Sequence, residues 1–410
     1  MRTRRAHQPT SSATKAARRR KARRAQRVVR LVELVVIGLV VTASIVGWHL
    51  ATGGPAVTGR SAARRGPVAL RVVAVSPGDG ALGVAPMMPI TVRFSAPIAL
   101  HSPLPVTSPP VPGRWARDGP EELVLHPSAP LLPLTSVTLR VPGEGSGVRA
   151  VDGARLASTV VDRWQVGEGS VLRLQQVLAT LGYLPLTWTP ATAGHLDARE
   201  DLRALYHAPA GSFAWRYANT PASLQQAWEP GVDNHMTTGA MVAFEVHDGL
   251  PGYTSIRPLL WPVLLSAEEA GRMNPVGYTY ALVSQALPES LTLWHDGTDV
   301  LETTVNTGID ATPTPTGTFF VYRRFASTTM SGTNPNGSYY LDHGVRWVNY
   351  FDGGVAIHGF VRSSYGFPQS LGCVELPLAE AAAAWDWIHY GTVVTVLGEP
   401  SATIAASASQ

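Results

Sequence analysis

The stretch GVAIHGFVRSSYGFPQSLGCVEL, residues 354–376, decides how this chain is interpreted. A run typical of a β-strand leads into His358, and Cys373 follows fifteen residues later, just before a predicted helix over 377–390. A thiol with an ordinary pKa near ~8.5 is mostly protonated at neutral pH, so attack on an amide requires an adjacent base or a positive dipole. His358 and the start of the helix can supply both.

Each of these residues also has an ordinary interpretation. A single cysteine is often an inert small hydrophobe, and a histidine on a strand is often part of the core. The combination favours a nucleophile and a base. Gly372 allows a tight turn before the cysteine, and we expect it to leave amide N–H groups free to face an oxyanion. Because the chain has one cysteine, an internal disulfide is excluded and Cys373 is predicted to be a free thiol.

The sequence around this pair predicts an all-β domain over 276–398 with the one helix after the cysteine. Runs rich in β-branched and aromatic residues alternate with turn signals, among them the hairpin signal Asn336-Gly337. The expected strands are YTYALVS (278–284), LTLWHDG (291–297), VLETTVNTG (300–308), GTFFVYRRF (317–325), GSYYLD (337–342), VRWVNYF (345–351), GVAIHGF (354–360) and TVVTVLG (392–398).

The spacing of His-Gly and the later Ser-x-Gly-Cys-Val-x-Leu resembles the YkuD-type L,D-transpeptidase catalytic domain. The segment Thr312-Pro-Thr-Pro-Thr-Gly317 before TFFVY is similar to that family's Thr-Pro-x-Gly-x-Phe segment, and the resemblance covers about 276–397. It implies that Cys373 is the nucleophile and His358 its base. The positions that it implies to shape the substrate and oxyanion site are Gly359, Ser370, Leu371 and Gly372.

Two residues depart from the family pattern. Leu371 stands where the family usually has a histidine, which removes one proton carrier or oxyanion donor. Glu375 stands where the family usually has Arg or Asn, and an inward-pointing acid there would raise the pKa of the thiol.

The resemblance also implies a reaction on peptidoglycan stem peptides without a cofactor. The cysteine attacks the carbonyl between the third stem residue and the terminal D-alanine, D-alanine leaves, and the amine of a second stem resolves the thioester into a 3→3 cross-link. It implies acylation by carbapenems as well. Two alternatives stay open: an L,D-carboxypeptidase, in which water resolves the thioester, and a catalytically degenerate wall-binding protein.

Other polar residues give weaker signals. His343 and His389 lack metal-ligand spacing, and the chain has no HExxH, no CxxC and no Gly-rich phosphate loop, so neither a metal nor a nucleotide cofactor is expected. Five residues near the histidine are candidates either for the cleft or for ordinary strand packing: Asn349, Tyr350, Arg362, Ser363 and Ser364.

The start of the sequence predicts a membrane anchor. Residues 1–30 hold 12 of the 33 Lys and Arg residues and no acid, so the rest of the chain has 21 basic and 29 acidic residues. The apolar run 31–50 is long enough for a bilayer-spanning helix, and the positive-inside rule places 1–30 in the cytoplasm and the remainder outside. This favours membrane binding over a nucleic-acid partner for the basic tail. A cleaved signal peptide followed by secretion is the alternative; the oligomeric state is not predicted.

The remaining segments predict a multidomain, mainly β protein. Residues 51–67 are expected to be a linker, 68–166 a β-sandwich that resembles bacterial Ig-like domains, and 399–410 a tail. Residues 169–268 resemble small helical peptidoglycan-binding modules through VLRLQQVLATLGYL and TTGAMVAFEVHDGL, with an aromatic-rich insertion over 185–236. The aromatic residues of that insertion can stack on sugars or pack in a core.

Overall fold

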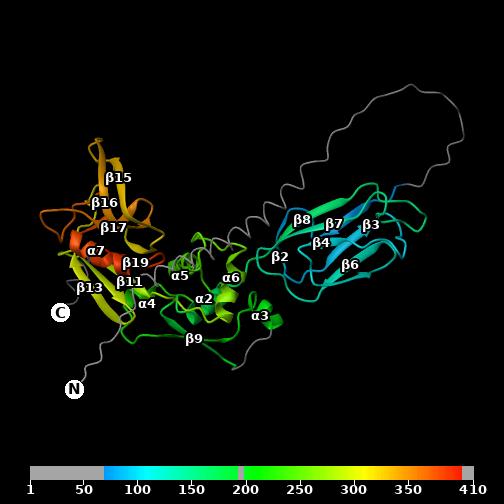
Figure 1. Ribbon diagram of the computed structural model, residues 1–410, viewed down its shortest axis with the longest axis horizontal. Helices are drawn as coiled ribbons and strands as arrows, with labels where there is room; N and C mark the ends of the chain where they lie inside the picture. Colours follow the sequence, from blue (N-terminus) through cyan, green and yellow to red (C-terminus); the bar gives the residue numbers. More distant parts are fainter. Residues whose placement is uncertain (1–68, 193–197, 399–410) are drawn as a thin grey trace, which may run out of the picture. The chain divides into compact units, whose positions relative to one another are not determined.

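The computed structural model describes residues 69–192 and 198–398 (Figure 1). The predicted basic tail, membrane span, linker and C-terminal tail lie outside the described residues. Within the described ranges, no helix combines the length and the apolar character needed to cross a membrane.

The segment predicted to be Ig-like forms two four-stranded sheets with one core between them. Their strand orders are β1-β3-β6-β5 and β2-β8-β7-β4. In β7 every second residue is buried, including Val137, Leu139 and Val141, which is the alternation of a strand with one face in a core. The strands are β1 (Val72–Ser76), β2 (Ala81–Val84), β3 (Ile90–Phe94), β4 (Val106–Ser108), β5 (Gly113–Arg117), β6 (Glu122–Pro127), β7 (Ser136–Val141) and β8 (Val160–Val166).

The helical module follows directly. Ser170 caps its first helix by accepting a hydrogen bond from the Arg173 N–H, and Gly182, with φ of +80°, follows the end of that helix as expected. Residues 173–179 of this helix are all buried, so the helix is covered on every side, and Leu174, Val177 and Leu178 belong to the hydrophobic core. The elements are α2 (Val171–Thr180), β9 (Leu186–Pro190), α3 (Ala198–Ala204), β10 (Gly211–Trp215), α4 (Ala222–Gln226), α5 (His235–His247) and α6 (Leu260–Glu269).

Two sheets and one helix form the C-terminal domain. The sheet orders are β13-β12-β11-β19-β14 and β15-β16-β17-β18. The elements are β11 (Thr279–Ser284), β12 (Ser290–His295), β13 (Thr298–Thr304), β14 (Gly317–Phe320), β15 (Arg323–Thr333), β16 (Tyr339–Asp352), β17 (Val355–Gly359), β18 (Val374–Leu376), α7 (Leu378–Trp387) and β19 (Val393–Leu397).

Four local predictions for this domain were wrong. The strand expected over 317–325 is divided between β14 and β15, which belong to different sheets. The two strands expected over 337–351 are one strand, β16, which stays paired with β15 through an irregularity near Met330. The loop between them spans 334–338 and so is longer than a two-residue turn, although Gly337 has the expected positive φ of +84°. The helix after the cysteine ends at Trp387 rather than 390, because the backbone at Ile388 is already extended.

The helical module and the C-terminal domain share one hydrophobic core. Tyr280, Trp294 and Val393 belong to the same buried cluster as the residues of α2 and α5. Asn274, which lies between the predicted segments 169–268 and 276–398, is tied to both sides through its side-chain amide, which donates to the carbonyls of Gly182 and Gly277. The predicted boundary is therefore a packed junction.

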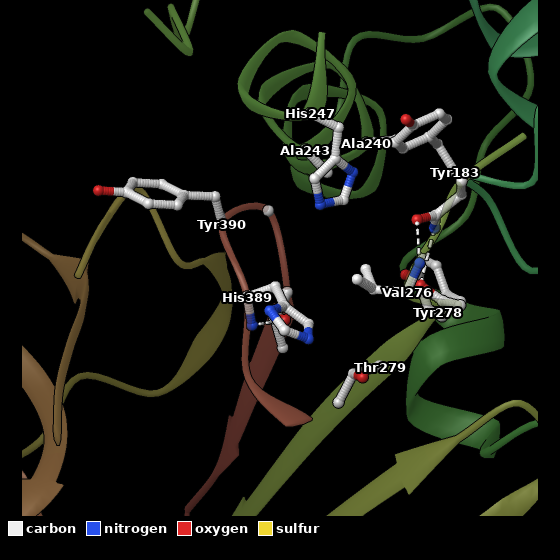
Figure 2. A pocket seen from close by; sticks show the side chains of 13 residues that line it. Tyr183, Ala240, Ala243, His247, Val276, Tyr278, Thr279, His389 and Tyr390 are labelled. Atoms are coloured by element: carbon white, nitrogen blue, oxygen red, sulfur yellow. Dashed lines mark hydrogen bonds between the residues drawn. The ribbon is translucent and has the colours of Figure 1, made fainter. Parts of the chain in front are cut away.

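A close glycine contact fixes α5 against the turn before β19. A Cβ added to Gly239 would lie 2.7 Å from the Gly391 carbonyl oxygen, so the two backbones approach as nearly as glycines permit. Beside this contact lies a small pocket, in which His247 of α5 faces His389 (Figure 2). The pKa of His389 is lowered to about 4 by burial and by the neighbouring Arg324 and His247.

Candidate active site

Cys373 and His358 lie on neighbouring parallel strands. His358 is in β17, and Cys373 is the residue before β18, whose Val374 and Glu375 are in register with Ile357 and His358. Residues in register on parallel strands point to the same face, and residues two apart on a strand share a face. The structure therefore brings the predicted nucleophile and base to one face of the sheet.

The hydrogen bond of His358 identifies which ring nitrogen is available as a base. His358 is 3% exposed, and its Nδ1 lies 3.1 Å from the carbonyl oxygen of Gly359. A carbonyl only accepts hydrogen bonds, so Nδ1 carries the proton and Nε2 has the free lone pair in the neutral ring. Burial lowers the pKa of His358, which keeps the ring neutral at neutral pH.

The Cys373 thiol is protonated at rest. The residue is half-buried and packs against a small apolar cluster that includes Val345, Val348 and Ala356. Burial raises its pKa to about 11; a hydrogen bond from the Ala356 backbone lowers it and the charge of Glu375 raises it. With this pKa, less than about one thiol in a thousand is ionised at pH 7.5. Attack on a carbonyl must therefore be accompanied by proton removal, for which a neutral imidazole is suited.

The turn before the cysteine is held by Ser370 and Thr314. Ser370 Oγ donates to the Cys373 carbonyl at 2.5 Å and accepts from the Gly372 N–H at 3.0 Å. Gly372 has φ of +115°, so the glycine is required there, as predicted. Of the amide N–H groups expected to face an oxyanion, that of Gly372 is instead engaged by Ser370.

Glu375 is buried and paired. Its carboxylate accepts from Arg362 Nε at 2.7 Å and from Nη2 at 2.8 Å. The hydrogen bonds to Glu375 raise the pKa of Arg362. Glu375, which departs from the family pattern, thus has a charged partner thirteen residues earlier in the chain.

Buried polar groups hold the segment between His358 and Cys373. Asn306 accepts from the Gly366 N–H at 3.1 Å and exchanges backbone hydrogen bonds with Glu375. The Glu289 carboxylate accepts from the N–H and the hydroxyl of Thr307, whose carbonyl accepts from the Ser370 N–H. These contacts come from the segment before the Thr-Pro turn, so the loop is supported from a second part of the domain.

Two tyrosines of β16 are influenced by the charge of the thiol, and one of them was not predicted. Burial raises the pKa of both Tyr340 and Tyr350, and the charge of an ionised Cys373 raises it further. Tyr350 was among the candidates, whereas Tyr340 was not, because the expected strand ended two residues later and showed no relation to the cysteine. The register of the long β15–β16 hairpin is what brings it there.

The other candidates have structural roles or lie elsewhere. Asn349 is buried and accepts a hydrogen bond from Arg324 Nε, while the Ser364 carbonyl accepts from the Asn306 amide. Gly359 packs closely against Ala381 and Leu378 of α7, and Leu371 is half-buried. In the part of the chain that the structure describes, no group of three or more His, Cys, Asp or Glu residues could hold a metal ion.

Comparison with known proteins assigns two of the domains. Residues 278–396 match the family of the L,D-transpeptidase catalytic domain (YkuD), and residues 67–165 match that of the bacterial Ig-like domain. The C-terminal domain is thus a YkuD domain, and through it the chain belongs to the L,D-transpeptidases. None of the curated proteins matches the chain.

Solved structures with similarity to the chain are also L,D-transpeptidases. The catalytic domain of an enzyme from E. faecium is 30% identical over 29% of this chain and 96% of its own, with a TM-score of 0.27. An enzyme from Mycobacterium smegmatis is 14% identical over 80% of this chain and all (100%) of its own, with a TM-score of 0.26. LdtMt1 in complex with imipenem is 15% identical over 80% of this chain and 98% of its own, with a TM-score of 0.27. The assignment rests on the family match and not on these superpositions.

Proposed function

We propose that the chain is a cysteine-dependent L,D-transpeptidase that forms 3→3 cross-links in peptidoglycan and releases D-alanine. The observation that carries the proposal is the arrangement of Cys373 and His358 on one sheet face, with Nδ1 of the histidine bound to Gly359 and Nε2 free. This is the arrangement that a thiol with a raised pKa needs in order to become a nucleophile.

Each step of the proposed reaction balances with the two side chains. Sγ of Cys373 attacks the carbonyl carbon before the terminal D-alanine while its proton moves to Nε2 of His358. The tetrahedral intermediate collapses as the imidazolium returns that proton to the leaving amine, so D-alanine departs and a thioester remains. The side-chain amine of a second stem then attacks the thioester, again losing its proton to His358, and the thiol leaves with that proton.

The rest of the chain fits an enzyme that works in the wall. The predicted span over 31–50 would anchor it to the cell membrane in a single pass, with the catalytic domain outside the cell. The Ig-like domain and the helical module would then carry the catalytic domain away from the membrane toward stem peptides. Binding of the wall by the helical module belongs to the same proposal.

Acylation by imipenem tests the thiol chemistry. The lactam ring opens on attack, so the wild type should gain one adduct with the mass of the intact lactam, seen by intact-protein mass spectrometry. Cys373→Ala should gain none, and His358→Gln should be acylated at least ~100-fold more slowly because no base removes the thiol proton. A wild-type protein that stays unmodified would favour the degenerate wall-binding protein.

A further inference from the structure

Glu375 places a buried acid beside Cys373 and His358. The residue is 4% exposed and lies in register with His358, two positions after the cysteine. The three side chains therefore belong to one face of the β17–β18 pair. Burying a carboxylate costs free energy unless a partner compensates its charge.

Arg362 is that partner, and it is linked to the base through Phe360. Two parallel hydrogen bonds join its guanidinium to the Glu375 carboxylate, which fixes the orientation of both planar groups. The guanidinium carbon lies 4.7 Å from the centre of the Phe360 ring. That ring meets the His358 ring edge-on, with centroids 6.0 Å apart and planes at 83°. Arg362, Phe360 and His358 thus form a continuous stack that ends at the base.

We propose that Arg362 and Glu375 are positioning residues for the thiol chemistry: together they hold His358 toward Cys373 and keep the charge beside the thiol balanced. The proposal rests on the proposed acyl-transfer function. In it neither residue touches the substrate, and both act through the cysteine and the histidine.

The charges around the pair support this role. At His358, Glu375 raises the pKa and Arg362 lowers it, so the two oppose each other; Asp342 raises it further. At Cys373, Glu375 adds to the increase in pKa that burial causes. The pKa values of the Tyr340 and Tyr350 phenols are raised by burial and, to a smaller extent, by the charge of an ionised Cys373. If Arg362 were removed, Glu375 would raise the pKa of both His358 and Cys373 without compensation.

The pH dependence of alkylation by iodoacetamide tests the proposal on the full chain. Cys373 is the only cysteine, so the label reports this thiol alone. The variants are Glu375→Gln, Arg362→Met, the double variant and Arg362→Lys. Arg272→Met serves as the matched control, because Arg272 pairs with Asp248 at 3.1 Å in the helical module. Thermal unfolding of each variant shows whether it is folded.

If Arg362 and Glu375 balance the charge beside the thiol, substitution of either residue alone should shift the pKa of the thiol, in opposite directions for the two residues. Glu375→Gln should lower the apparent pKa of the thiol by about 0.5–1 unit, since Arg362 is left uncompensated, and Arg362→Met should raise it by a similar amount. The double variant should return close to the wild-type value, and the control should stay at it. If Arg362→Met does not fold, Glu375→Gln and the double variant carry the test, because neither contains the unpaired buried acid. Identical titration of these variants and the wild type would overturn this part.

The orientation part is tested by Arg362→Lys. Lysine keeps the charge but not the two-pronged geometry, so the thiol pKa should stay near the wild-type value while acylation by imipenem slows at least ~5-fold. Unchanged acylation would overturn the positioning role. Failure of the proposed function and failure of this inference can be distinguished. If the wild type is never acylated but the variants show the alkylation shifts, only the proposed function is contradicted. If acylation is normal but no shifts occur, only this inference is contradicted.

Discussion

Thr314 Oγ1 donates a hydrogen bond of 2.9 Å to the carbonyl oxygen of Gly372, the residue before the cysteine. The same hydroxyl accepts from the Gly308 N–H at 2.8 Å. Both bonds are buried, so Thr314→Val should leave an N–H and a carbonyl without partners and lower the free energy of unfolding by about 1–3 kcal/mol. Urea unfolding measures this change, and acylation by imipenem should slow because the turn carrying Cys373 loosens.

Thr312 supplies the matched control in the same Thr-Pro turn. Its hydroxyl is buried and has no hydrogen-bond partner among the described residues, so Thr312→Val removes none of the described bonds. We expect its stability to equal or exceed that of the wild type. Equal losses in both valine variants would show that the turn responds to the shape of the residue and not to the Thr314 hydrogen bonds.

The pH dependence of acylation should reflect a histidine that stays neutral in mild acid. Because burial lowers the pKa of His358 below its ordinary value of 6.5, the base keeps its lone pair to a lower pH than an ordinary histidine does. The rate constant for acylation by imipenem should therefore fall by less than half from pH 7.5 to 6.5 and decline further at lower pH. A rate that halves near pH 7 or above would contradict the assigned environment of His358.

His389 should make the free energy of unfolding depend on pH. Its folded pKa is about 4, below the unfolded value of 6.5, so the unfolded chain takes up a proton first as the pH falls. This contribution to stability is present at neutral pH and is lost between about pH 6.5 and 4. The pKa of the facing His247 is also lowered by burial, which acts in the same direction (Figure 2).

Substitution of the histidine isolates this effect. His389→Gln cannot be protonated, so its melting temperature should fall less between pH 7 and 5 than that of the wild type, as measured by differential scanning fluorimetry. His343→Gln, at an exposed position of β16, should keep the wild-type pH dependence. Parallel curves for wild type and His389→Gln would contradict the prediction.

The contact between Gly239 and Gly391 predicts that Gly239→Ala lowers the stability of the fold, although Gly→Ala substitutions usually stabilise helices. In an open helix, Gly→Ala stabilises by about 1 kcal/mol. At Gly239 the new methyl group would meet the Gly391 carbonyl at 2.7 Å, so we expect Gly239→Ala to destabilise the fold by about 1–3 kcal/mol instead. Gly145→Ala, where nothing lies within 4 Å, is the control and should be close to neutral in urea unfolding. A more stable Gly239→Ala would mean that the two backbones are not held together.

Local sequence was enough to single out Cys373 and His358 as candidates and to predict most strands. Cys373 and His358 are close in sequence, and the runs of apolar and β-branched residues in β11, β12 and β17 are visible without a structure. The helix α2 was equally clear from its apolar spacing and from Gly182. These features depend on neighbours within about twenty residues.

Features that depend on tertiary contacts could not be predicted in the same way. The partner of Glu375 lies in a loop with no regular pattern, and Tyr340 reaches the thiol only through the register of the β15–β16 hairpin. The junction near Asn274 looks like a linker because it contains Pro and Gly, yet its hydrogen bonds join a core shared by two segments. Sequence patterns report local conformation and burial, but not which segments meet.

Product analysis with a disaccharide tetrapeptide tests the central claim most directly. The account predicts that the purified full chain converts two tetrapeptides into a dimer whose mass equals the two substrates minus one D-alanine, and that Cys373→Ala forms none. A tripeptide without dimer would instead identify an L,D-carboxypeptidase. Tetrapeptide that remains unchanged with wild-type protein, under conditions where the protein is folded, would contradict the account.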